Sequence, residues 1–349
     1  MAITLALSAD SKKTTLLNYC NVEGLIKKDG EIKGLNFTDS INSKKYQIKS
    51  KVVINATGVF AEEIIRMDQP KIEKMIQPSQ GVHIVLERRF LKSKHAILIP
   101  QTSDGRVLFA VPWKNYVVVG TTDTHVKKAS EEPKALKEEV DFILKNAGKY
   151  MSVKPKRDDI KSVFAGLRPL AATSNKQSTK EVSRSHKIDI SPSGLISVLG
   201  GKWTTYRKIA EDALNTAISI NKLKKKKCKT ERTKLFGFKR NVSWSDPMHV
   251  YGSLKKKVES LGGVNDNKSL SKKFYISNNI IEWSIIHEMA LTVDDILARR
   301  TRCVFLDSKE SKRIAPVVAK KMADVLGEDD KWIDAELKKF NKLIKNYIV

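Results

Sequence analysis

The chain has 349 residues, of which 41% are hydrophobic and 30% are charged, a composition typical of a soluble globular protein with two or three domains. No apolar run approaches the roughly 20 residues of a membrane-spanning helix, and the start of the chain, Met1–Asp10, lacks the basic residues and long apolar core of a signal peptide. The three cysteines, Cys20, Cys228 and Cys303, form no CxxC pair. They favour reduced thiols in a cytoplasmic setting over a disulfide framework or a metal site.

The formal net charge is +26 at neutral pH, and it is carried mainly by lysines that are spread along the chain, apart from the run Lys224–Lys227. Few of these lysines lie beside aromatic residues, as a stacking platform for nucleic acid would require. We interpret the charge as a generally basic surface. Weak attraction to an anionic membrane is the second interpretation, and no nucleic-acid partner is expected.

The first predicted region extends to about residue 76. Thr15–Asn18 and Glu31–Phe37 have the pattern of strands, and Lys51–Gly58 is typical of a buried strand that ends in a turn of small residues. The second region, from about residue 77 to residue 170, is rich in β patterns. Its predicted elements are strands at Gly81–Leu86, Ala96–Pro100, Arg106–Val111 and Tyr116–Gly120, a hairpin turn at Pro112–Asn115 and a helix between Glu132 and Lys149.

A glycine pair, Gly200–Gly201, then separates a short apolar strand (Gly194–Leu199) from a helix whose apolar stripe runs from Tyr206 to Ile218. Such a strand, turn and helix start directs free backbone N–H groups and the positive end of the helix dipole toward an anion. Lys202 adds a full charge, and Thr204 or Thr205 is expected to cap the helix. An ordinary strand-to-helix turn is the alternative interpretation of these residues.

The third predicted region follows the lysine run and is mostly helical. One long helix is expected to run through Arg300, because its apolar residues recur at helical spacing from Ile281 to Leu297. Two further helices are predicted near Ile314–Leu326 and Trp332–Tyr347.

Seven short motifs occur in one order along the chain, and any one of them alone would be weak evidence. They are Asn55–Gly58, Pro78–His83, Gly120–Asp123, Ala165–Leu170, Ser183–His186, Gly200–Arg207 and Glu288–Arg302. In this combination the chain resembles the FAD-dependent glycerol-3-phosphate dehydrogenases over essentially its whole length.

The resemblance implies an α/β plus α+β fold. It assigns residues 1–76 and 184–222 to a partial FAD-binding domain of the glutathione-reductase-like or D-amino-acid-oxidase-like type. Residues 77–183 would form an antiparallel β-rich substrate-binding domain, and residues 228–349 an α-helical C-terminal domain.

The activity that the resemblance implies is oxidation of sn-glycerol 3-phosphate to dihydroxyacetone phosphate with FAD as cofactor, electrons passing to the quinone pool. The protein would then lie in the cytoplasm or peripherally on the inner face of the cell membrane. Two alternatives stay open: the related oxidase, which reduces oxygen, and a non-catalytic or pseudoenzyme subunit of a split enzyme.

The resemblance also assigns substrate residues. Arg168 and Arg184 would bind the phosphate, because guanidinium groups match phosphate oxygens bidentately, and Lys202 would help to hold the substrate. His83 and His186 are the histidines within matched motifs, and either would orient the substrate or accept a proton. No chemistry is assigned to Glu288–Arg302.

The expected cofactor residues surround two turns. Ala56, Thr57 and Gly58 match the family's turn against FAD, and Val22 would offer backbone hydrogen bonds near the adenine. Four further residues would face the flavin edge where charge accumulates on reduction: Gly200, Gly201, Lys202 and Thr204.

One feature of the family is missing from the chain. The family opens with a βαβ unit carrying GxGxxG, which seats the pyrophosphate of FAD, and none of the 349 residues form this motif. We therefore expect a truncated product, one piece of a split gene with a separately encoded N-terminal piece as partner, or an incomplete sequence. In each case FAD should bind to this chain weakly or not at all.

Overall fold

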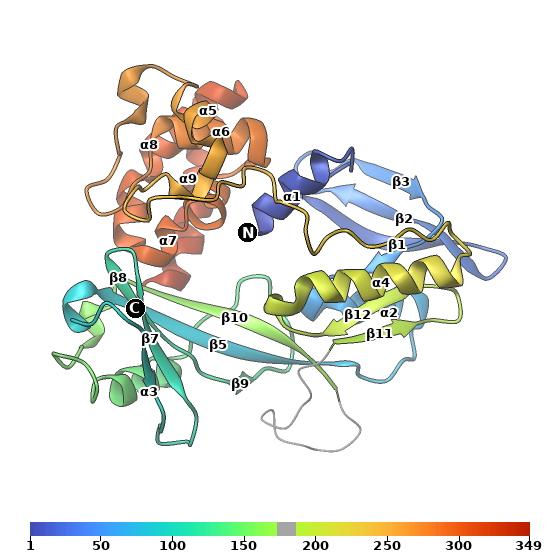
Figure 1. Cartoon of the computed structure of the whole chain (residues 1–349), viewed down its shortest axis with the longest axis horizontal. Coiled ribbons are helices and arrows are strands. Elements are labelled where there is room, and N and C mark those ends of the chain that lie inside the picture. Colours follow the sequence, from blue (N-terminus) through green and yellow to red (C-terminus); the bar gives the residue numbers. More distant parts are fainter. Residues whose placement is uncertain (173–185) are drawn as a thin grey trace.

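The computed structural model describes residues 1–172 and 186–349, which form three sheets and a group of helices (Figure 1). The first sheet is antiparallel, with strands in the order β1-β2-β3. Its elements are β1 (Cys20–Lys28), β2 (Glu31–Asp39) and β3 (Lys45–Lys49), preceded by helix α1 (Ala2–Asp10). The prediction of a strand at Glu31–Phe37 is confirmed by β2.

The strand predicted at Thr15–Asn18 is wrong. These residues adopt no strand, and β1 begins only at Cys20. Tyr19 has a left-handed backbone with φ of 56°, which turns the chain immediately before the strand. Asn18 donates a hydrogen bond of 2.7 Å to the carbonyl of Met289, so this segment lies against the C-terminal helices and is not paired in a sheet.

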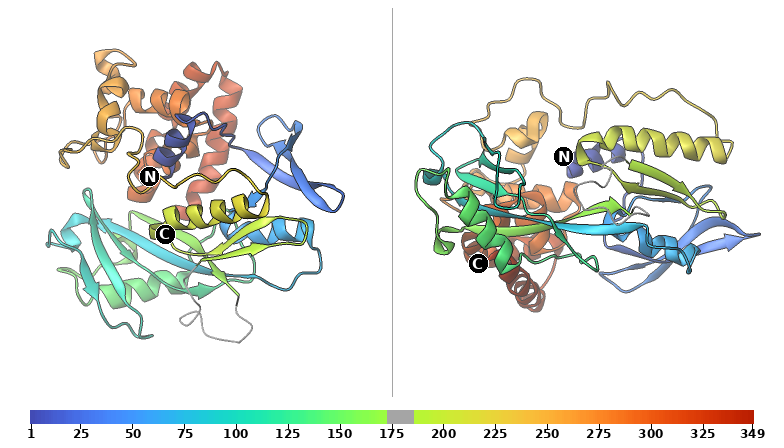
Figure 2. Two further views of the ribbon diagram at one scale, coloured as in Figure 1. Left: turned by 45° about the vertical axis from the view of Figure 1, so that its right-hand side comes forward. Right: turned by 90° about the horizontal axis from the view of Figure 1, so that it is seen from below.

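The second sheet has the order β11-β12-β4, in which β12 is antiparallel to β11 and parallel to β4. Its strands are β4 (Ile54–Asn55), β11 (His186–Ile190) and β12 (Ile196–Gly200). Helix α4 (Tyr206–Ile220) packs against β11 and β12, as the two views of Figure 2 also show. A 3₁₀ turn, η1 (Gly58–Phe60), and helix α2 (Ala61–Asp68) follow β4.

The third sheet has six strands, ordered β10-β5-β8-β7-β6 with β9 also paired to β5. Helix α3 and the 3₁₀ turns η2 and η3 connect these strands. The bounds are β5 (Ile76–Glu87), η2 (Arg88–Phe90), β6 (Ile97–Ile99), β7 (Leu108–Trp113), β8 (Tyr116–Gly120), β9 (Thr124–His125), α3 (Lys137–Ala147), η3 (Arg157–Asp159) and β10 (Ser162–Ala171). The hairpin turn predicted at Pro112–Asn115 is shorter than expected, because β7 continues through Trp113.

Alternation along the strands divides the packing of the six-stranded sheet between its two faces. Val82, Ile84 and Leu86 point to the face that α3 covers, where they are fully buried. Val85, on the opposite face, packs in the core that the C-terminal helices build. Period-two alternation places successive side chains on opposite faces, so β5 connects two separate cores.

The C-terminal helices pack at one end of the six-stranded sheet (Figure 1). Residues 221–248 cross from α4 to this helical region without forming a helix or strand. The helical elements are η5 (His249–Leu254), α5 (Lys255–Glu259), η6 (Val264–Asn267), α6 (Asn278–Glu288), η7 (Asp295–Arg300), α7 (Cys303–Leu306), α8 (Ser308–Leu326), α9 (Asp330–Leu343) and η8 (Ile344–Tyr347). The two helices predicted after residue 313 are confirmed by α8 and by α9 with η8.

The single helix predicted through Arg300 is wrong. Helix α6 ends at Met289, which adopts a left-handed backbone, and the π-helical segment η7 starts anew after Thr292. The Thr292 hydroxyl accepts a hydrogen bond from the backbone N–H of Asp295, and the Asp295 carboxylate accepts one from the N–H of Thr292. This reciprocal capping box satisfies the amides that a continuous helix would have bonded, so it starts a new helix.

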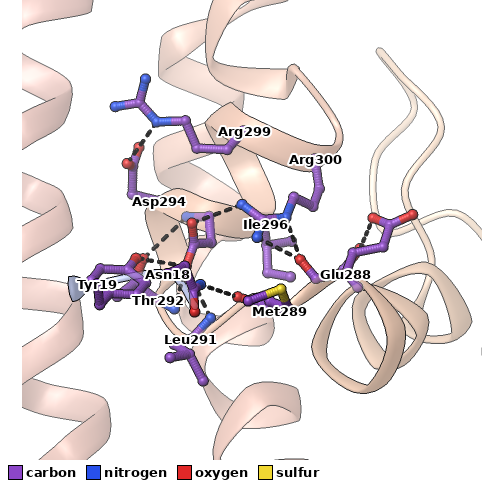
Figure 3. Close-up of polar contacts among 12 residues, drawn as sticks. Asn18, Tyr19, Glu288, Met289, Leu291, Thr292, Asp294, Ile296, Arg299 and Arg300 are labelled. Carbon is purple, nitrogen blue, oxygen red and sulfur yellow. Dashed lines mark hydrogen bonds and ion pairs between the residues drawn. The ribbon is translucent and has the colours of Figure 1, made fainter. Parts of the chain in front are cut away.

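Asp295 also connects the helices to the segment before β1. Figure 3 shows Asn18 and Tyr19 of this segment beside Met289 and Thr292. Asp295 uses both of its carboxylate oxygens. One carboxylate oxygen accepts a hydrogen bond of 2.6 Å from the Tyr19 hydroxyl, and the other lies 2.8 Å from Nη1 of Arg300. Nε and Nη2 of Arg300 both donate to the carbonyl of Glu288 at the end of α6. We refer to Asn18, Tyr19, Asp295 and Arg300 as the Asp295 cluster.

Within residues 1–172 and 186–349, no helix is both long and apolar enough to cross a membrane. The same residues hold no group of three or more His, Cys, Asp or Glu side chains placed to bind a metal ion. The three cysteines are free thiols, with Cys303 buried, Cys20 half-buried and Cys228 exposed.

Candidate active site

Two predicted cofactor turns lie at the same edge of the β11-β12-β4 sheet. Strands β4 and β12 run parallel, with Ile54 opposite Ile196 and Asn55 opposite Ser197. Ala56–Gly58 follows β4, and Gly200–Lys202 follows β12, so both turns leave the carboxyl edge. Ligands of open α/β sheets bind in the crevice outside this edge.

Side-chain hydrogen bonds of Asn55 stabilise the conformation of the first turn. Its side-chain oxygen accepts a hydrogen bond of 2.8 Å from the Thr57 hydroxyl, and its amide donates to the Ala61 carbonyl at 2.9 Å. Asn55 is buried, whereas Ala56 and Thr57 are exposed. A Cβ added at Gly58 would meet no atom within 4 Å, so the space beside this turn is open.

The second turn depends on backbone conformations that favour glycine. Gly200 and Gly201 have φ values of 68° and 88°, and the chain then forms a 3₁₀ turn, η4 (Trp203–Thr205), before α4. Lys202 and Thr204 are exposed. The predicted threonine cap is wrong: Thr205 occupies the N-cap position, but its hydroxyl donates to the Lys202 carbonyl and caps no amide of α4.

Gly201 is required for packing as well as for its backbone angle. A Cβ at this position would lie 2.7 Å from Cδ1 of Ile209 and 3.3 Å from Cβ of His186. At Gly194, whose φ is also 88°, a Cβ would meet no atom within 4 Å. Comparing substitutions at the two glycines therefore separates the free-energy cost of the backbone angle from the free-energy cost of the close contact.

We expect Gly194→Ala to lower the free energy of unfolding by about 1 kcal/mol, the cost of a left-handed non-glycine residue. Gly201→Ala should lower it by about 2–4 kcal/mol, because the contact with Ile209 adds an overpacking cost of about 1–3 kcal/mol. Urea unfolding of both variants without added flavin measures the difference. Equal losses would show that Gly201 is needed for its φ angle alone.

Two of the predicted site residues, Arg168 and His83, share one face of the six-stranded sheet. In the β5–β10 pair, Arg168 lies opposite Ser79, and Phe164 lies opposite His83. Directly paired residues of an antiparallel sheet point to the same side, so His83 and Arg168 belong to one face. Gly81 and Gly166 are paired between them, and a Cβ on Gly166 would meet no atom within 4 Å.

Arg168 is held in place by the end of β8 and the residues that follow it. Nη2 of Arg168 donates to the Thr121 hydroxyl and to the Thr122 carbonyl, both at 3.1 Å. Nη1 lies 3.7 Å from Oδ1 of Asp123. A Cβ at Gly81 would collide with the guanidinium, so glycine is needed for Arg168 to lie across β5.

His83 is largely enclosed on this face. Its ring stacks on Phe164, with ring centroids 5.2 Å apart and an angle of 12° between the planes. Burial, with a smaller contribution from the Arg168 charge, lowers the pKa of His83 to about 4. The imidazole is therefore neutral at pH 7 and has a lone pair available as a hydrogen-bond or proton acceptor.

The structure does not bring His186 to this face. His186 begins β11 in the other sheet, opposite Gly200, and its Nε2 lies 3.0 Å from Oδ2 of Asp212 on α4. Val22 pairs with Phe37 in β1, the edge strand of the first sheet. Arg184 lies outside the described residues.

The two parts of the candidate site are neighbours. Strand β10 packs against η1, which contains Gly58, and against β12, which ends at Gly200. Figure 1 shows β10 extending from the helical end of the molecule to β12. The strand that carries Arg168 therefore packs against the elements that hold the two turns.

Sequence reasoning missed the supporting residues Gly81, Gly166, Thr121 and Asp123. These residues lie in the motifs Pro78–His83, Gly120–Asp123 and Ala165–Leu170. Strand alternation within the motifs indicates that Gly81 shares a face with His83, and that Gly166 shares a face with Arg168. The sequence does not show the strand register that pairs β5 with β10.

Residues 1–207 match the family described as FAD dependent oxidoreductase, and residues 196–333 match the C-terminal domain of alpha-glycerophosphate oxidase. The chain belongs to the FAD-dependent oxidoreductase family. The predicted fold class is thereby confirmed, and FAD is the cofactor of this family.

Similar proteins confirm the resemblance drawn from the motifs. The chain is 34% identical to the probable mitochondrial glycerol-3-phosphate dehydrogenase of Dictyostelium discoideum, over 100% of this chain and 59% of that protein. It is 32% identical to the mitochondrial enzyme of Bos taurus, over 99% of this chain and 51% of that protein. The chain thus spans about half the length of the curated relatives it matches.

A solved structure shares the fold. The X-ray structure of the glycerol-3-phosphate dehydrogenase from Bacillus halodurans, complexed with FAD, superposes with a TM-score of 0.85 at 24% identity. The match covers 99% of this chain and 72% of that one.

Proposed function

We propose that this chain supplies the flavin-facing turns and the substrate-facing sheet for FAD-dependent oxidation of sn-glycerol 3-phosphate to dihydroxyacetone phosphate. One observation supports the proposal: β10, the strand that carries Arg168, packs against η1 and β12, the elements that hold the two turns. When bound, FAD accepts the hydride from C2 of the substrate.

Arg168 would bind the phosphate. Its guanidinium is already oriented by Thr121 and Thr122, so little side-chain freedom is lost on binding. By the resemblance, Arg184 is proposed as a second phosphate ligand, and Lys202 is proposed to help hold the substrate. Gly166 leaves open space beside Arg168 in which the short carbon chain would lie.

His83 is our candidate for the proton acceptor. It would accept a hydrogen bond from the C2 hydroxyl and then take its proton as the hydride leaves. A phosphate bound at Arg168 would offset the positive charge that helps to lower the pKa of His83. Substrate binding would therefore make His83 a stronger base. His186, engaged with Asp212, would have an orienting role near the second turn.

The flavin part of FAD fits the residues that are present. Ala56, Thr57 and Gly58 offer a small-residue surface with open space, and Lys202 and Thr204 are exposed at the start of α4. The first turn of α4 carries no acidic side chain, so the positive end of its dipole is not neutralised there. Gly200, Gly201 and Lys202 would stabilise negative charge on the reduced flavin. Val22 is proposed to lie near the adenine.

The pyrophosphate part of FAD needs a GxGxxG unit, and the chain has none. We propose that a GxGxxG unit completes the cofactor site. By the resemblance, the electron acceptor is proposed to be membrane quinone. The net charge of +26 would then attract the protein to an anionic membrane surface. The second family match is named for an oxidase, so oxygen is the competing acceptor.

We expect the purified chain to lose FAD on desalting, since each missing charge-assisted hydrogen bond to the pyrophosphate costs about 1.5–3 kcal/mol. Mixed with a polypeptide carrying a relative's GxGxxG unit, it should stay yellow, and anaerobic glycerol 3-phosphate should bleach it. Visible absorbance measures both results.

Stoichiometric FAD on the chain alone would contradict the incomplete cofactor site. A completed yellow protein that glycerol 3-phosphate leaves unreduced would contradict the proposed substrate. Oxygen uptake during turnover would favour the oxidase over the quinone-dependent enzyme.

A further inference from the structure

A row of aromatic rings leads from His83 into the C-terminal helices. Phe164 stacks on His83, and Phe305 meets the Phe164 ring edge-on, with centroids 5.0 Å apart at an interplanar angle of 79°. Tyr347 meets Phe305 in the same way, at 5.6 Å and 78°. These edge-to-face and stacked geometries are the ones that aromatic pairs prefer.

The rings come from three parts of the chain. Phe164 is on β10, Phe305 on α7 and Tyr347 on η8. Phe305 and Phe164 pack against the same core, in which Tyr347 is buried. The helical region therefore reaches the face of the sheet that holds His83 through a continuous set of ring contacts.

His83 has little room to move on its other side. Gly120 lies directly opposite His83 on β8, and a Cβ at Gly120 would come within 2.8 Å of Cγ of the imidazole. The imidazole is thus confined between the backbone of β8 and the ring of Phe164. Its ring lies nearly parallel to that of Phe164, which Phe305 meets edge-on.

The far end of the row is anchored by a polar contact. The Tyr347 hydroxyl donates a hydrogen bond of 3.0 Å to Oε2 of Glu132. Glu132 also binds the guanidinium of Arg299, which pairs with Asp294 at 3.2 Å (Figure 3). The motif Glu288–Arg302, which has no assigned chemistry, therefore fixes Tyr347 through Arg299 and Glu132.

We propose that Phe305 and Tyr347 are positioning residues, which act through Phe164 to hold the His83 imidazole in its orientation on the substrate-facing sheet. The inference rests on the proposed function only in giving His83 a task there. It assigns the helical region a role in the geometry of the site, beyond closing the core.

NMR of the full chain with ¹³C-labelled histidine tests this proposal without FAD or substrate. The chain has six histidines, and His83→Gln identifies the His83 signal. In Phe305→Leu the packing that confines His83 loosens, so its resonance should move and its titration midpoint should rise by roughly one pH unit. Arg168 is the charged group acting on His83, and it is unchanged in this variant.

Phe274→Leu is the matched control, because Phe274 is buried in the same core but has no place in the row of rings. It should leave the His83 signal and midpoint unchanged. Tyr347→Leu should move the His83 signal, whereas Tyr347→Phe keeps the ring and should move it less. The other five histidine signals report whether each variant is folded.

An unchanged His83 signal in folded Phe305→Leu would overturn the proposal, as would an equal shift in Phe274→Leu. If Phe305→Leu does not fold, Tyr347→Leu decides by the same two criteria. Failure of glycerol 3-phosphate to bind would refute the proposed substrate while leaving this result intact, so the two failures are distinguishable.

Discussion

Arg300→Met should be among the most destabilising single substitutions in this chain, lowering the free energy of unfolding by about 3–5 kcal/mol. The side chains of Arg300 and Asp295 are only 8% and 9% exposed, so the substitution would leave a buried carboxylate without its cation. It would also remove both hydrogen bonds to the Glu288 carbonyl at the end of α6. Urea unfolding followed by circular dichroism measures the loss.

Arg89→Met provides the control for this prediction. Arg89 also makes two ion pairs of 2.9 Å, with Glu87 and Asp159, but its side chain is 58% exposed. Exposed ion pairs contribute little, so the midpoint of unfolding should barely change. A similar small change for Arg300→Met would show that the Asp295 cluster does not stabilise the contact between α6, η7 and the segment before β1.

Strong periodic patterns were enough to predict much of the fold. The apolar stripe from Tyr206 to Ile218 lies within α4, and the apolar run at Tyr116–Gly120 coincides with β8. These patterns are local, so they can be read from the sequence without knowledge of strand pairing.

The break after α6 could not be found from the apolar stripe, because the same spacing continues through Met289 to Leu297. A local signal was present in Thr292 and Asp295, which form a capping box at T-x-x-D spacing. The apolar spacing favoured a continuous helix over this signal. A buried segment has apolar residues whether or not its helix is continuous, so the spacing does not show where a helix ends.

The sequence was enough to predict which residues form the candidate site, but not how they are arranged in space. The motifs named Arg168 and His83, whereas their common face depends on the register of β5 against β10. The contact of His83 with Gly120 and Phe164 joins residues far apart in the chain. Single-sequence patterns contain no information on such pairing, so these contacts required the structure.

Arg168→Met should produce the largest change in recognition of the substrate. A charge-assisted contact of an arginine with phosphate contributes about 2–4 kcal/mol in total. The dissociation constant for glycerol 3-phosphate should therefore rise roughly 30- to 1000-fold. Arg157→Met is the matched control: the Arg157 side chain is 36% exposed, against 34% for Arg168, but it pairs with Asp141 on α3. The control should bind the substrate normally.

The central claim is that the face with Arg168 and His83 recognises glycerol 3-phosphate. It is tested most directly by a ³¹P NMR titration of glycerol 3-phosphate with the chain completed by FAD and by the polypeptide that carries a relative's GxGxxG unit. We expect saturable binding to the unsubstituted chain and to Arg157→Met, competition by inorganic phosphate but not by glycerol, and loss of binding in Arg168→Met. Equal binding to the chain and to Arg168→Met, or no binding to either, would contradict the claim.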